Sequence, residues 1–273
     1  MVTKLSRYLP KSVLKLGSEL KWRYRKNSYE SVYFYTFHKC ASSLFSGYVL
    51  RNIEGLRCVD YASQIYSGRK NDAVTFERNG FVYGPIRLSA NPMSPVYKRL
   101  VEPAIDSDFI RNKIAIFLVR DPRDILVSAY YSFGYTHGFS NVDEIKEVQE
   151  QRKIQIQSKT IDEYALEAAH GTLRNFETVD RLNKACTRSV VLKYEDMIEN
   201  WDSFAKGLTK YINIKQQVLA QIYAQTRPRE REDTKSHRRS GKPGGFRGKL
   251  KAETIAFLNT TFEAVLERFQ YEV

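Results

Sequence analysis

Hydrophobic residues along the chain gather in short runs that alternate with longer amphipathic segments. The short runs, which predict strands, lie at residues 32–37, 57–61, 81–84, 113–119 and 189–194. The amphipathic segments, which predict helices, lie at residues 42–52, 122–133, 160–185, 195–210 and 253–269. Apolar strands that alternate with helices are typical of a parallel sheet covered on both faces. The predicted fold class is therefore α/β, a single domain with a central parallel sheet flanked by helices.

Three segments fall outside this alternation. Residues 1–30 are basic with leucines at helical spacing, so we expect a helical N-terminal segment before a main domain at residues 31–273. Residues 141–160 are rich in charge and glutamine, which favours a solvated helix over a mobile substrate lid. Residues 226–250 lack periodicity and are dense in Arg, Gly and Pro. This last segment is either a linker or a loop that folds over a bound anion.

One strand-to-helix junction is suited to hold an anion. The apolar run that ends at Val119 continues into the residues Arg120-Asp121-Pro122-Arg123-Asp124 and then into a helix that carries Ser128. Asp121 fits the N-cap and Pro122 the first turn, and the free N–H groups of a helix N-terminus attract anions. Arg120 and Ser128 are separated by about two helical turns, so both fit one phosphate. A capped turn with a salt-bridged arginine explains the same residues.

A second junction of the same kind lies upstream. The aromatic-rich run at residues 32–37 leads into His38-Lys39-Cys40-Ala41-Ser42-Ser43 and an apolar helix. A lysine and two hydroxyls at such a turn follow the logic of a phosphate-binding loop. The nucleoside-triphosphatase pattern GxxxxGK[ST] is absent, because no glycine stands between Tyr33 and Ser46.

Together the two junctions resemble the sulfotransferases that use 3'-phosphoadenosine 5'-phosphosulfate (PAPS). Members of that family look like TYPKSGTTW at the 5'-phosphosulfate loop and RxxxDxxxSxYY at the 3'-phosphate site; here the segments read TFHKCASSL (36–44) and RDPRDILVSAYY (120–131). The segment 190–196, which contains Tyr194-Glu195-Asp196, is similar to a third family motif. The Arg238-Arg239-Ser240-Gly241 segment, followed by Gly244-Gly245, resembles the C-terminal phosphate clamp. The resemblance covers roughly residues 31–250.

The resemblance implies a P-loop-like three-layer sulfotransferase domain that needs no metal. It implies that Lys39 acts on the bridging oxygen of the leaving phosphate, while other residues hold the cofactor and its desulfated product, adenosine 3',5'-bisphosphate (PAP). The implied cofactor-binding residues are Lys39, Cys40, Ala41, Ser42, Ser43, Arg120, Ser128, Tyr194, Arg238, Arg239 and Gly241.

The chain departs from the family pattern at three places. Leu44 stands where many members have an adenine-stacking tryptophan, and Ala41 replaces a loop glycine. The strand segment 82–87 lacks the histidine that acts as general base in small-molecule members. Carbohydrate and tyrosine sulfotransferases use a carboxylate instead, which nominates Asp60 as the base, followed by Glu54 and Glu77. His38 is the rival candidate, since it adjoins Lys39.

The composition and net charge of the chain limit the kinds of partner and the location that we expect. The chain has 44 Lys and Arg against 31 Asp and Glu, a formal net charge of +13, which favours anionic partners such as a phosphorylated cofactor, an acidic glycan, nucleic acid or a membrane surface. Three cysteines without a CxxC pair indicate neither a disulfide framework nor a zinc site, and no apolar run is long enough for a transmembrane segment. We therefore expect a cytoplasmic protein.

The predicted function is transfer of a sulfuryl group from PAPS to a hydroxyl or amine of a small molecule or natural product. A glycan sulfotransferase is the alternative within the family. A nucleotide-dependent kinase would need a glycine-rich loop and a magnesium-binding Asp, and it leaves the segment RDPRD with Ser128 unexplained. A basic nucleic-acid-binding protein that uses residues 226–250 leaves both anion loops unexplained, so we expect no nucleic-acid partner.

Overall fold

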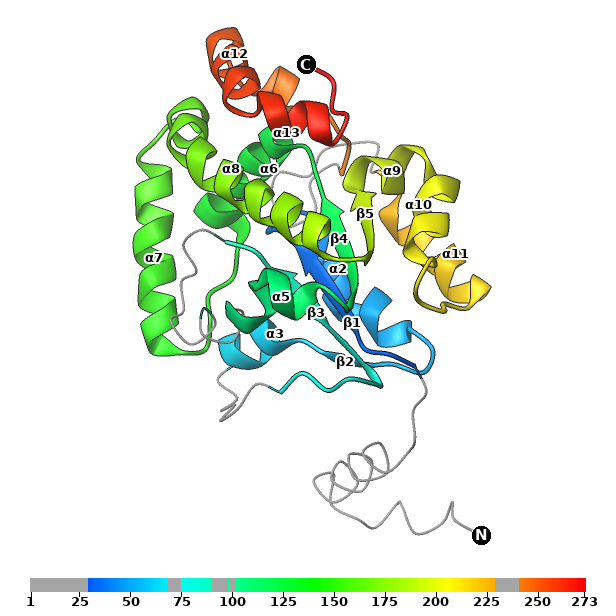
Figure 1. Cartoon of the computed structure of the whole chain (residues 1–273). Coiled ribbons are helices and arrows are strands. Elements are labelled where there is room, and N and C mark those ends of the chain that lie inside the picture. The colour runs from blue at the N-terminus through cyan, green and yellow to red at the C-terminus, as the bar shows by residue number, and fades with distance from the viewer. Residues whose placement is uncertain (1–28, 68–74, 90–97, 99–101, 229–240) are drawn as a thin grey trace.

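The computed structural model describes residues 29–67, 75–89, 98, 102–228 and 241–273 (Figure 1). Its sheet has five parallel strands in the order β2-β3-β1-β4-β5. The strands are β1 (Val32–Thr36), β2 (Arg57–Val59), β3 (Phe81–Arg87), β4 (Ile114–Val119) and β5 (Arg188–Lys193). The predicted α/β fold with a central parallel sheet is confirmed.

Helices cover both faces of the sheet, as the three-layer prediction requires (Figure 1). They are α2 (Ser42–Gly47), α3 (Tyr61–Tyr66), α5 (Ser107–Ile110), α6 (Pro122–Tyr131), α7 (Asp143–Gln157), α8 (Ile161–Ala185), α9 (Tyr194–Glu199), α10 (Trp201–Leu208), α11 (Gln216–Thr226), α12 (Ala252–Thr261) and α13 (Glu263–Arg268). Helix α8 packs on β4 and β5 on one side, and α10 packs on β5. Within the described ranges, no helix combines the length and apolar character that crossing a membrane requires.

The expected helices differ from the observed ones in a few places. The solvated helix expected at 141–160 is α7, which exposes most of its side chains. The single helix expected at 195–210 is split at Asn200 into α9 and α10. Residues 1–28 and 229–240 lie outside the described residues, so the expected N-terminal helix and most of the basic loop at 226–250 are not described.

The core forms around the two central strands. Every residue of β1 and β4 is buried, which explains why both read as unbroken apolar runs. Aromatic rings link these strands to their neighbours: Phe34 stacks on Phe45 of α2 at 4.5 Å, and Tyr35 stacks on Phe117 at 5.1 Å. Both strands therefore leave this packed core and lead directly into the turns that carry Lys39 and Arg120.

Strand β3 continues beyond the predicted boundary at residue 84. Pro85 normally ends a central strand, because it cannot donate to the sheet. Here the register between β1 and β3 shifts, and a Cβ at Gly84 would lie 2.6 Å from the Phe34 carbonyl oxygen, so only glycine fits. The strand then resumes and pairs Arg87 with Thr36. This brings Arg87 beside the end of β1.

The turn between β4 and α6 contains a buried ion pair. Asp121 caps α6 by accepting a hydrogen bond from the Arg123 N–H, and its two carboxylate oxygens accept from Arg123 Nε (3.0 Å) and Nη2 (2.7 Å). Arg123 is only 1% exposed; it also donates to Asn259 of α12 and stacks on Phe246 at 4.2 Å. The pair thereby fixes the C-terminal helices against the anion junction.

We expect Arg123→Met to lower the free energy of unfolding by about 3–5 kcal/mol, because it leaves the Asp121 carboxylate buried without its charge partner. Arg111→Met is the matched control, since Arg111 pairs with Asp108 on the surface at 2.7 Å; its loss should be at most about 1 kcal/mol. Urea denaturation followed by circular dichroism measures both. Equal losses of unfolding free energy in the two variants would show that the buried ion pair contributes no more to stability than the surface pair.

Candidate functional site

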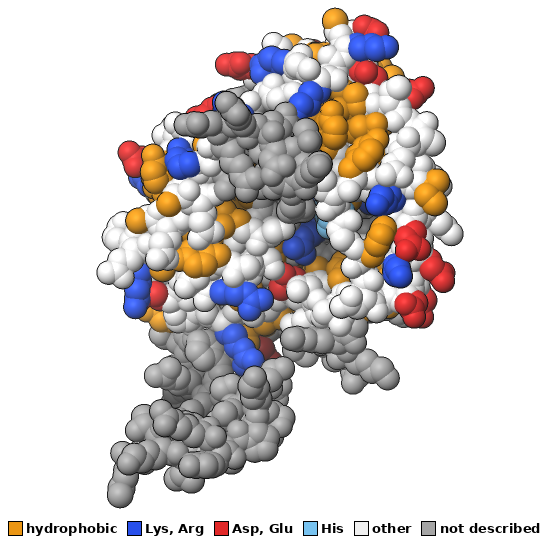
Figure 2. All heavy atoms as spheres, turned by 180° about the vertical axis from the view of Figure 1, so that it is seen from behind, with side chains coloured by type: hydrophobic (Ala, Val, Ile, Leu, Met, Phe, Trp, Pro, Cys, Tyr) orange, Lys and Arg blue, Asp and Glu red, His pale blue; other side chains and the backbone are white. Residues whose placement is uncertain are grey.

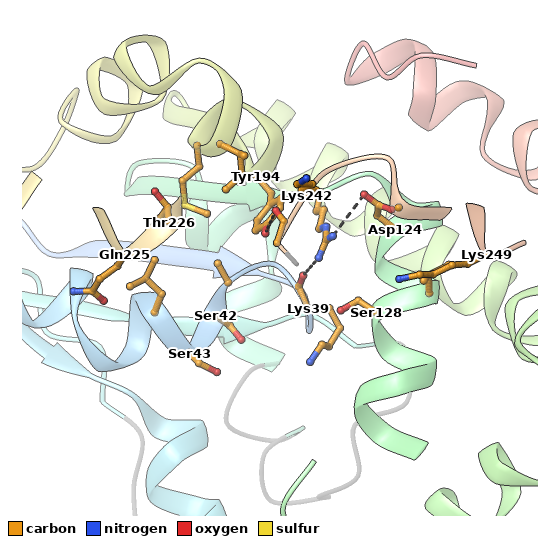
Figure 3. Close-up of a pocket in the computed structure, with 18 of the residues that line it drawn as sticks. Lys39, Ser42, Ser43, Asp124, Ser128, Tyr194, Gln225, Thr226, Lys242 and Lys249 are labelled. Carbon is orange, nitrogen blue, oxygen red and sulfur yellow. Dashed lines mark hydrogen bonds and ion pairs between the residues drawn. The ribbon is translucent and has the colours of Figure 1, made fainter. Parts of the chain in front are cut away.

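A cavity of about 520 Å³ lies beyond the carboxyl ends of β1, β4 and β5. Ligands of open parallel sheets bind at this edge, where the strand order reverses. On the face seen in Figure 2, Lys and Arg side chains line a central hollow together with a histidine and an acidic side chain. Figure 3 shows the cavity from close by, with Lys39, Ser42, Ser43 and Ser128 around one part of it, and Gln225 and Thr226 at the other.

The loop after β1 supplies one side of the cavity. Lys39 and Ala41 both adopt positive φ angles, 71° and 54°, so the backbone turns sharply before α2 begins at Ser42. Alanine is strained in this left-handed conformation, whereas glycine adopts it readily. The family pattern has a glycine at the position of Ala41. The Lys39 ammonium donates to Ser132 Oγ at 2.7 Å. Cys40 is buried and does not line the cavity, and burial raises the pKa of its thiol to about 12.

Arg120 joins this loop to the β4 junction. Its Nη1 donates to the Lys39 carbonyl oxygen at 3.0 Å, and its Nη2 lies 3.5 Å from Asp124 Oδ2 (Figure 3). The guanidinium stacks on the Tyr194 ring at 4.3 Å, and its Nε is buried without a hydrogen-bond partner. Burial opposes the charge of Arg120, but Asp124 and the neighbouring Tyr194 and Glu195 raise its pKa overall. The site therefore holds a permanent, rigidly placed positive charge.

The segment after residue 240 is tied to the site from two sides. The Tyr194 hydroxyl donates to the Gly241 carbonyl oxygen at 2.8 Å. Asp124 accepts from the Gly244 N–H at 2.8 Å and from the Phe246 N–H at 3.0 Å. Gly244 has a φ of 73°, which favours glycine. The predicted clamp segment thus meets the two anion loops at Gly241, whereas Arg238 and Arg239 lie outside the described residues.

Several residues of the cavity were not among the predicted site residues. Asp124 orients Arg120 and the 244–246 turn, and its place in the RxxxDxxxS spacing was the signal for it. Lys242 and Lys249 add positive charge to the cavity, and Lys249 Nζ lies 5.5 Å from the centre of the Tyr131 ring. The rest of the wall is mainly apolar, with two polar side chains at one end: Leu44, Met197, Ile198, Ala224, Gln225 and Thr226. Long-range packing brings these residues together, and no local pattern marks them.

The candidate bases lie outside the lining of this cavity. Asp60 caps α3: its side chain accepts from the Ser63 N–H at 2.9 Å and from Ser46 Oγ, and it lies 3.8 Å from Arg87 Nη1. Asp60 is 4% exposed. His38 packs edge-on against Phe133, and burial, followed by the charges of Arg87 and others, lowers its pKa well below the ordinary value.

The two further carboxylates that the sequence nominated are on the surface. Glu54 is exposed and lies 3.8 Å from Lys215 Nζ, which places it in a surface ion pair. Glu77 is exposed as well. Neither lines the cavity.

The buried carboxyl group of Glu195 lies next to the junction between β4 and α6. Glu195 Oε1 accepts from the Asp121 N–H at 3.0 Å, while Oε2 is buried near the Tyr271 hydroxyl without a hydrogen bond of good geometry. Burial raises the pKa of Glu195 to about 7, against the opposing effects of the Asp121 N–H and the charge of Arg120. The Glu195 carboxyl group therefore titrates near neutral pH, and it does so under the influence of the Arg120 charge.

Comparisons with known proteins agree with this geometry. A family model described as a sulfotransferase domain matches residues 105–270, which include Arg120, Ser128 and Tyr194 but not the Lys39 loop. A crystal structure of mouse sulfotransferase SULT7A1 complexed with PAP has a similar fold, with a TM-score of 0.52. The two chains are 13% identical, and the alignment covers 87% of this chain and 84% of the mouse chain. No curated protein sequence matches the chain significantly.

We expect Glu195→Gln to stabilise the protein above neutral pH. Because the pKa of Glu195 is about 7 in the folded state and near 4.5 when unfolded, the folded state binds the proton more tightly, and stability falls as pH rises from about 5 to 7. Glutamine removes this loss, which is about 3 kcal/mol at pH 8, and changes little at pH 5. Urea denaturation at both pH values tests this. Glu199→Gln, on the exposed part of the same helix, is the control; equal pH dependence in all three proteins would contradict the expectation.

Proposed function

This chain belongs to the sulfotransferase family, and we propose that it transfers a sulfuryl group from PAPS to a hydroxyl or amine of an acceptor. The observation that carries the proposal is the convergence of Arg120, Ser128 and Lys39 on one cavity from two different strand ends. Two separated groups of anion-binding residues fit a ligand with phosphates at both its 3' and 5' positions. An ordinary nucleoside triphosphate has a single phosphate chain.

We assign the 3'-phosphate to the Arg120 side of the cavity. A guanidinium binds a phosphate dianion through charge and parallel hydrogen bonds, and the Ser128 hydroxyl and the Lys249 ammonium lie on the same side (Figure 3). The Tyr194 ring and Asp124 keep the guanidinium in place before the ligand arrives. This preorganisation supports tight cofactor binding.

The adenine is assigned to the apolar end of the cavity. Leu44 takes the place of the stacking tryptophan of many family members, and Met197 and Ile198 form an apolar wall nearby. Purine faces pack well against aliphatic and thioether side chains. We assign Gln225, whose polar side chain lies at this end of the cavity, to the edge of the base.

The 5'-phosphosulfate is assigned to the Lys39 loop, with Ser42 and Ser43 as further donors. In the transfer, the acceptor oxygen forms a bond to sulfur, the bond from sulfur to the bridging oxygen breaks, and the electron pair stays on the departing 5'-phosphate. Lys39 stabilises the charge that grows on that oxygen. Its hydrogen bond to Ser132 positions the ammonium at the end of α6. The chemistry requires the protein to position groups and neutralise charge.

We propose Asp60 as the general base. His38 would become an imidazolium next to Lys39 and close to Arg87, and burial, followed by these charges, already lowers its pKa well below the ordinary value. A carboxylate accepts a proton from the acceptor without adding positive charge there. Asp60 lies 3.8 Å from Arg87 and has about four lone-pair sites, of which Ser63 and Ser46 occupy two.

The acceptor is proposed to be a small molecule or natural product, with a glycan as the alternative within the family. We also propose a single catalytic domain at residues 31–273, because the site draws on residues from Lys39 to Lys249. A cytoplasmic location is supported by the three cysteines, which are all free thiols.

The test of cofactor class is thermal stabilisation by PAP. PAP should raise the melting temperature more than AMP, which lacks the 3'-phosphate, because only PAP contacts Arg120 and Ser128. In Ser128→Ala, PAP affinity should fall about tenfold through the lost hydrogen bond to a charged group, while AMP affinity stays the same. A larger shift with ATP and magnesium than with PAP would favour a kinase and contradict the proposal.

The base assignment is tested by turnover at saturating PAPS. Asp60→Asn should lower kcat about 100-fold or more, the usual size of a lost general base, while PAP affinity stays within a few-fold. Ser46→Ala, which removes one hydrogen-bond donor to the same carboxylate, serves as the structural control. Near full activity of Asp60→Asn together with an inactive His38→Ala would move the role to His38.

A further inference from the structure

Glu195 carries a buried carboxyl group close to the cavity, and the proposed transfer reaction assigns no role to it. It is the second residue of α9, directly after Tyr194, which lines the cavity and stacks on Arg120. Glu195 Oε1 accepts a hydrogen bond from the Asp121 N–H at 3.0 Å. Asp121 follows Arg120 in the chain and is the N-cap of α6. The carboxyl group is therefore fixed close to the guanidinium that we assign to the 3'-phosphate.

The C-terminal segment adds a hydroxyl group to this place. Lys193 holds Tyr271 there, because its ammonium donates to the Gln270 carbonyl oxygen at 3.1 Å and lies 4.8 Å from the centre of the Tyr271 ring. Glu195 acts electrostatically on both Tyr271 and Arg120, so the three groups are close together. Among the described residues, Glu195 Oε2, the Tyr271 hydroxyl and Arg120 Nε are buried without a hydrogen bond of good geometry. Because Oε1 already accepts a backbone N–H, Oε2 is the oxygen that can take a proton, with the Tyr271 oxygen nearby as an acceptor.

Of the groups around this carboxyl, Glu195 itself is the one whose charge changes near neutral pH. Burial raises the pKa of Glu195 to about 7, against the opposing effects of the Asp121 N–H and the charge of Arg120. Burial also raises the pKa of the Cys40 thiol to about 12 and that of Tyr271 well above its ordinary value, so both groups stay neutral. The Asp121 carboxylate is held in its buried ion pair at 2.7 Å.

A phosphate dianion at Arg120 changes the electrostatic environment of Glu195 in two ways. It adds negative charge nearby, and it offsets the guanidinium charge that favours the carboxylate form. Both effects favour the protonated carboxyl group, so a proton from solvent bonds to Oε2 as the phosphate binds. When binding takes up a proton, affinity falls as pH rises through the range in which the unliganded group ionises.

We propose that Glu195 is a positioning residue for the cofactor, and that binding of a 3'-phosphate at Arg120 is coupled to uptake of a proton by the Glu195 carboxyl group. The neutral acid still accepts the Asp121 N–H, but it no longer competes with the phosphate for the charge of Arg120. The inference rests on the proposed sulfotransferase function and adds a proton to its cofactor-binding step. PAPS and PAP both carry the 3'-phosphate, so the coupling acts on cofactor affinity and not on the transfer step.

The first test measures proton uptake by calorimetry of PAP binding at pH 7.5 in HEPES and in Tris, two buffers with different heats of ionisation. If the phosphate makes Glu195 about tenfold weaker as an acid, PAP takes up about half a proton per molecule bound. AMP, which lacks the 3'-phosphate, should take up clearly less. Glu195→Gln should abolish the uptake, whereas Glu199→Gln, on the exposed part of α9, should keep it.

The second test follows cofactor affinity with pH. With the same tenfold change in acidity, the Kd for PAP of the unmodified protein should be about fivefold higher at pH 9 than at pH 7. Both phosphates of PAP are already mostly dianionic at pH 7, so the ligand contributes little to this change. In Glu195→Gln the Kd should stay constant, because glutamine mimics the protonated acid. The KM for PAPS should follow the same pattern, while the change of kcat with pH should be the same in both proteins.

Two results overturn the inference: PAP binding by the unmodified protein without proton uptake, or the same uptake and pH dependence in Glu195→Gln. Equal proton uptake with PAP and AMP overturns it as well, and this comparison requires no variant. All of these differ from failure of the proposed function, which shows as absence of PAP binding by the unmodified protein.

Discussion

The site depends on the position of one cation, Arg120. Its guanidinium hydrogen-bonds the Lys39 carbonyl, pairs with Asp124 and stacks on Tyr194, so it contacts the loop after β1, the first turn of α6 and the end of β5 at once. Tyr194 and Asp124 in turn hold the segment from Gly241 to Phe246. A buried charge is costly unless it is compensated from several sides. The same contacts that compensate Arg120 assemble the proposed cofactor site, so the fold and this cavity are stabilised by one network.

The carboxyl edge of the sheet divides into two regions that share Lys39. On the side of β4 and β5, the positive charge of Arg120 is paired with Asp124, and in the proposed function it binds the 3'-phosphate. On the side of β3 and β2, Arg87 lies 3.8 Å from Asp60, the residue proposed as general base. Lys39 lies between these regions, with its ammonium held by Ser132. This position fits the proposed role of Lys39 at the leaving oxygen.

The sequence could predict the parts of the site that are continuous along the chain. The strand, the cap at Asp121 and the spacing of Arg120 and Ser128 are local features, and they led to the correct family and fold. Arg87 could not be placed, because Pro85 normally ends a strand and only the register shift around Gly84 lets β3 continue. Arg152 and Phe133 are 19 positions apart on different elements, and their stacking depends on how α7 folds back. The role of Asp60 as a helix cap was likewise hidden, since the sequence does not show where α3 begins.

The position of β1 has a consequence for how the molecule is made. This strand is the first of the sheet in the chain, yet it lies at the centre between β3 and β4. The contact between Arg120 and the Lys39 carbonyl spans 81 positions, and the ties to Gly244 and Phe246 require still more of the chain. Contacts of such long sequence separation form late, after the cost of closing large loops has been met. During synthesis the cavity is therefore among the last features to appear, and a ligand that binds it selects fully assembled molecules over partly folded ones.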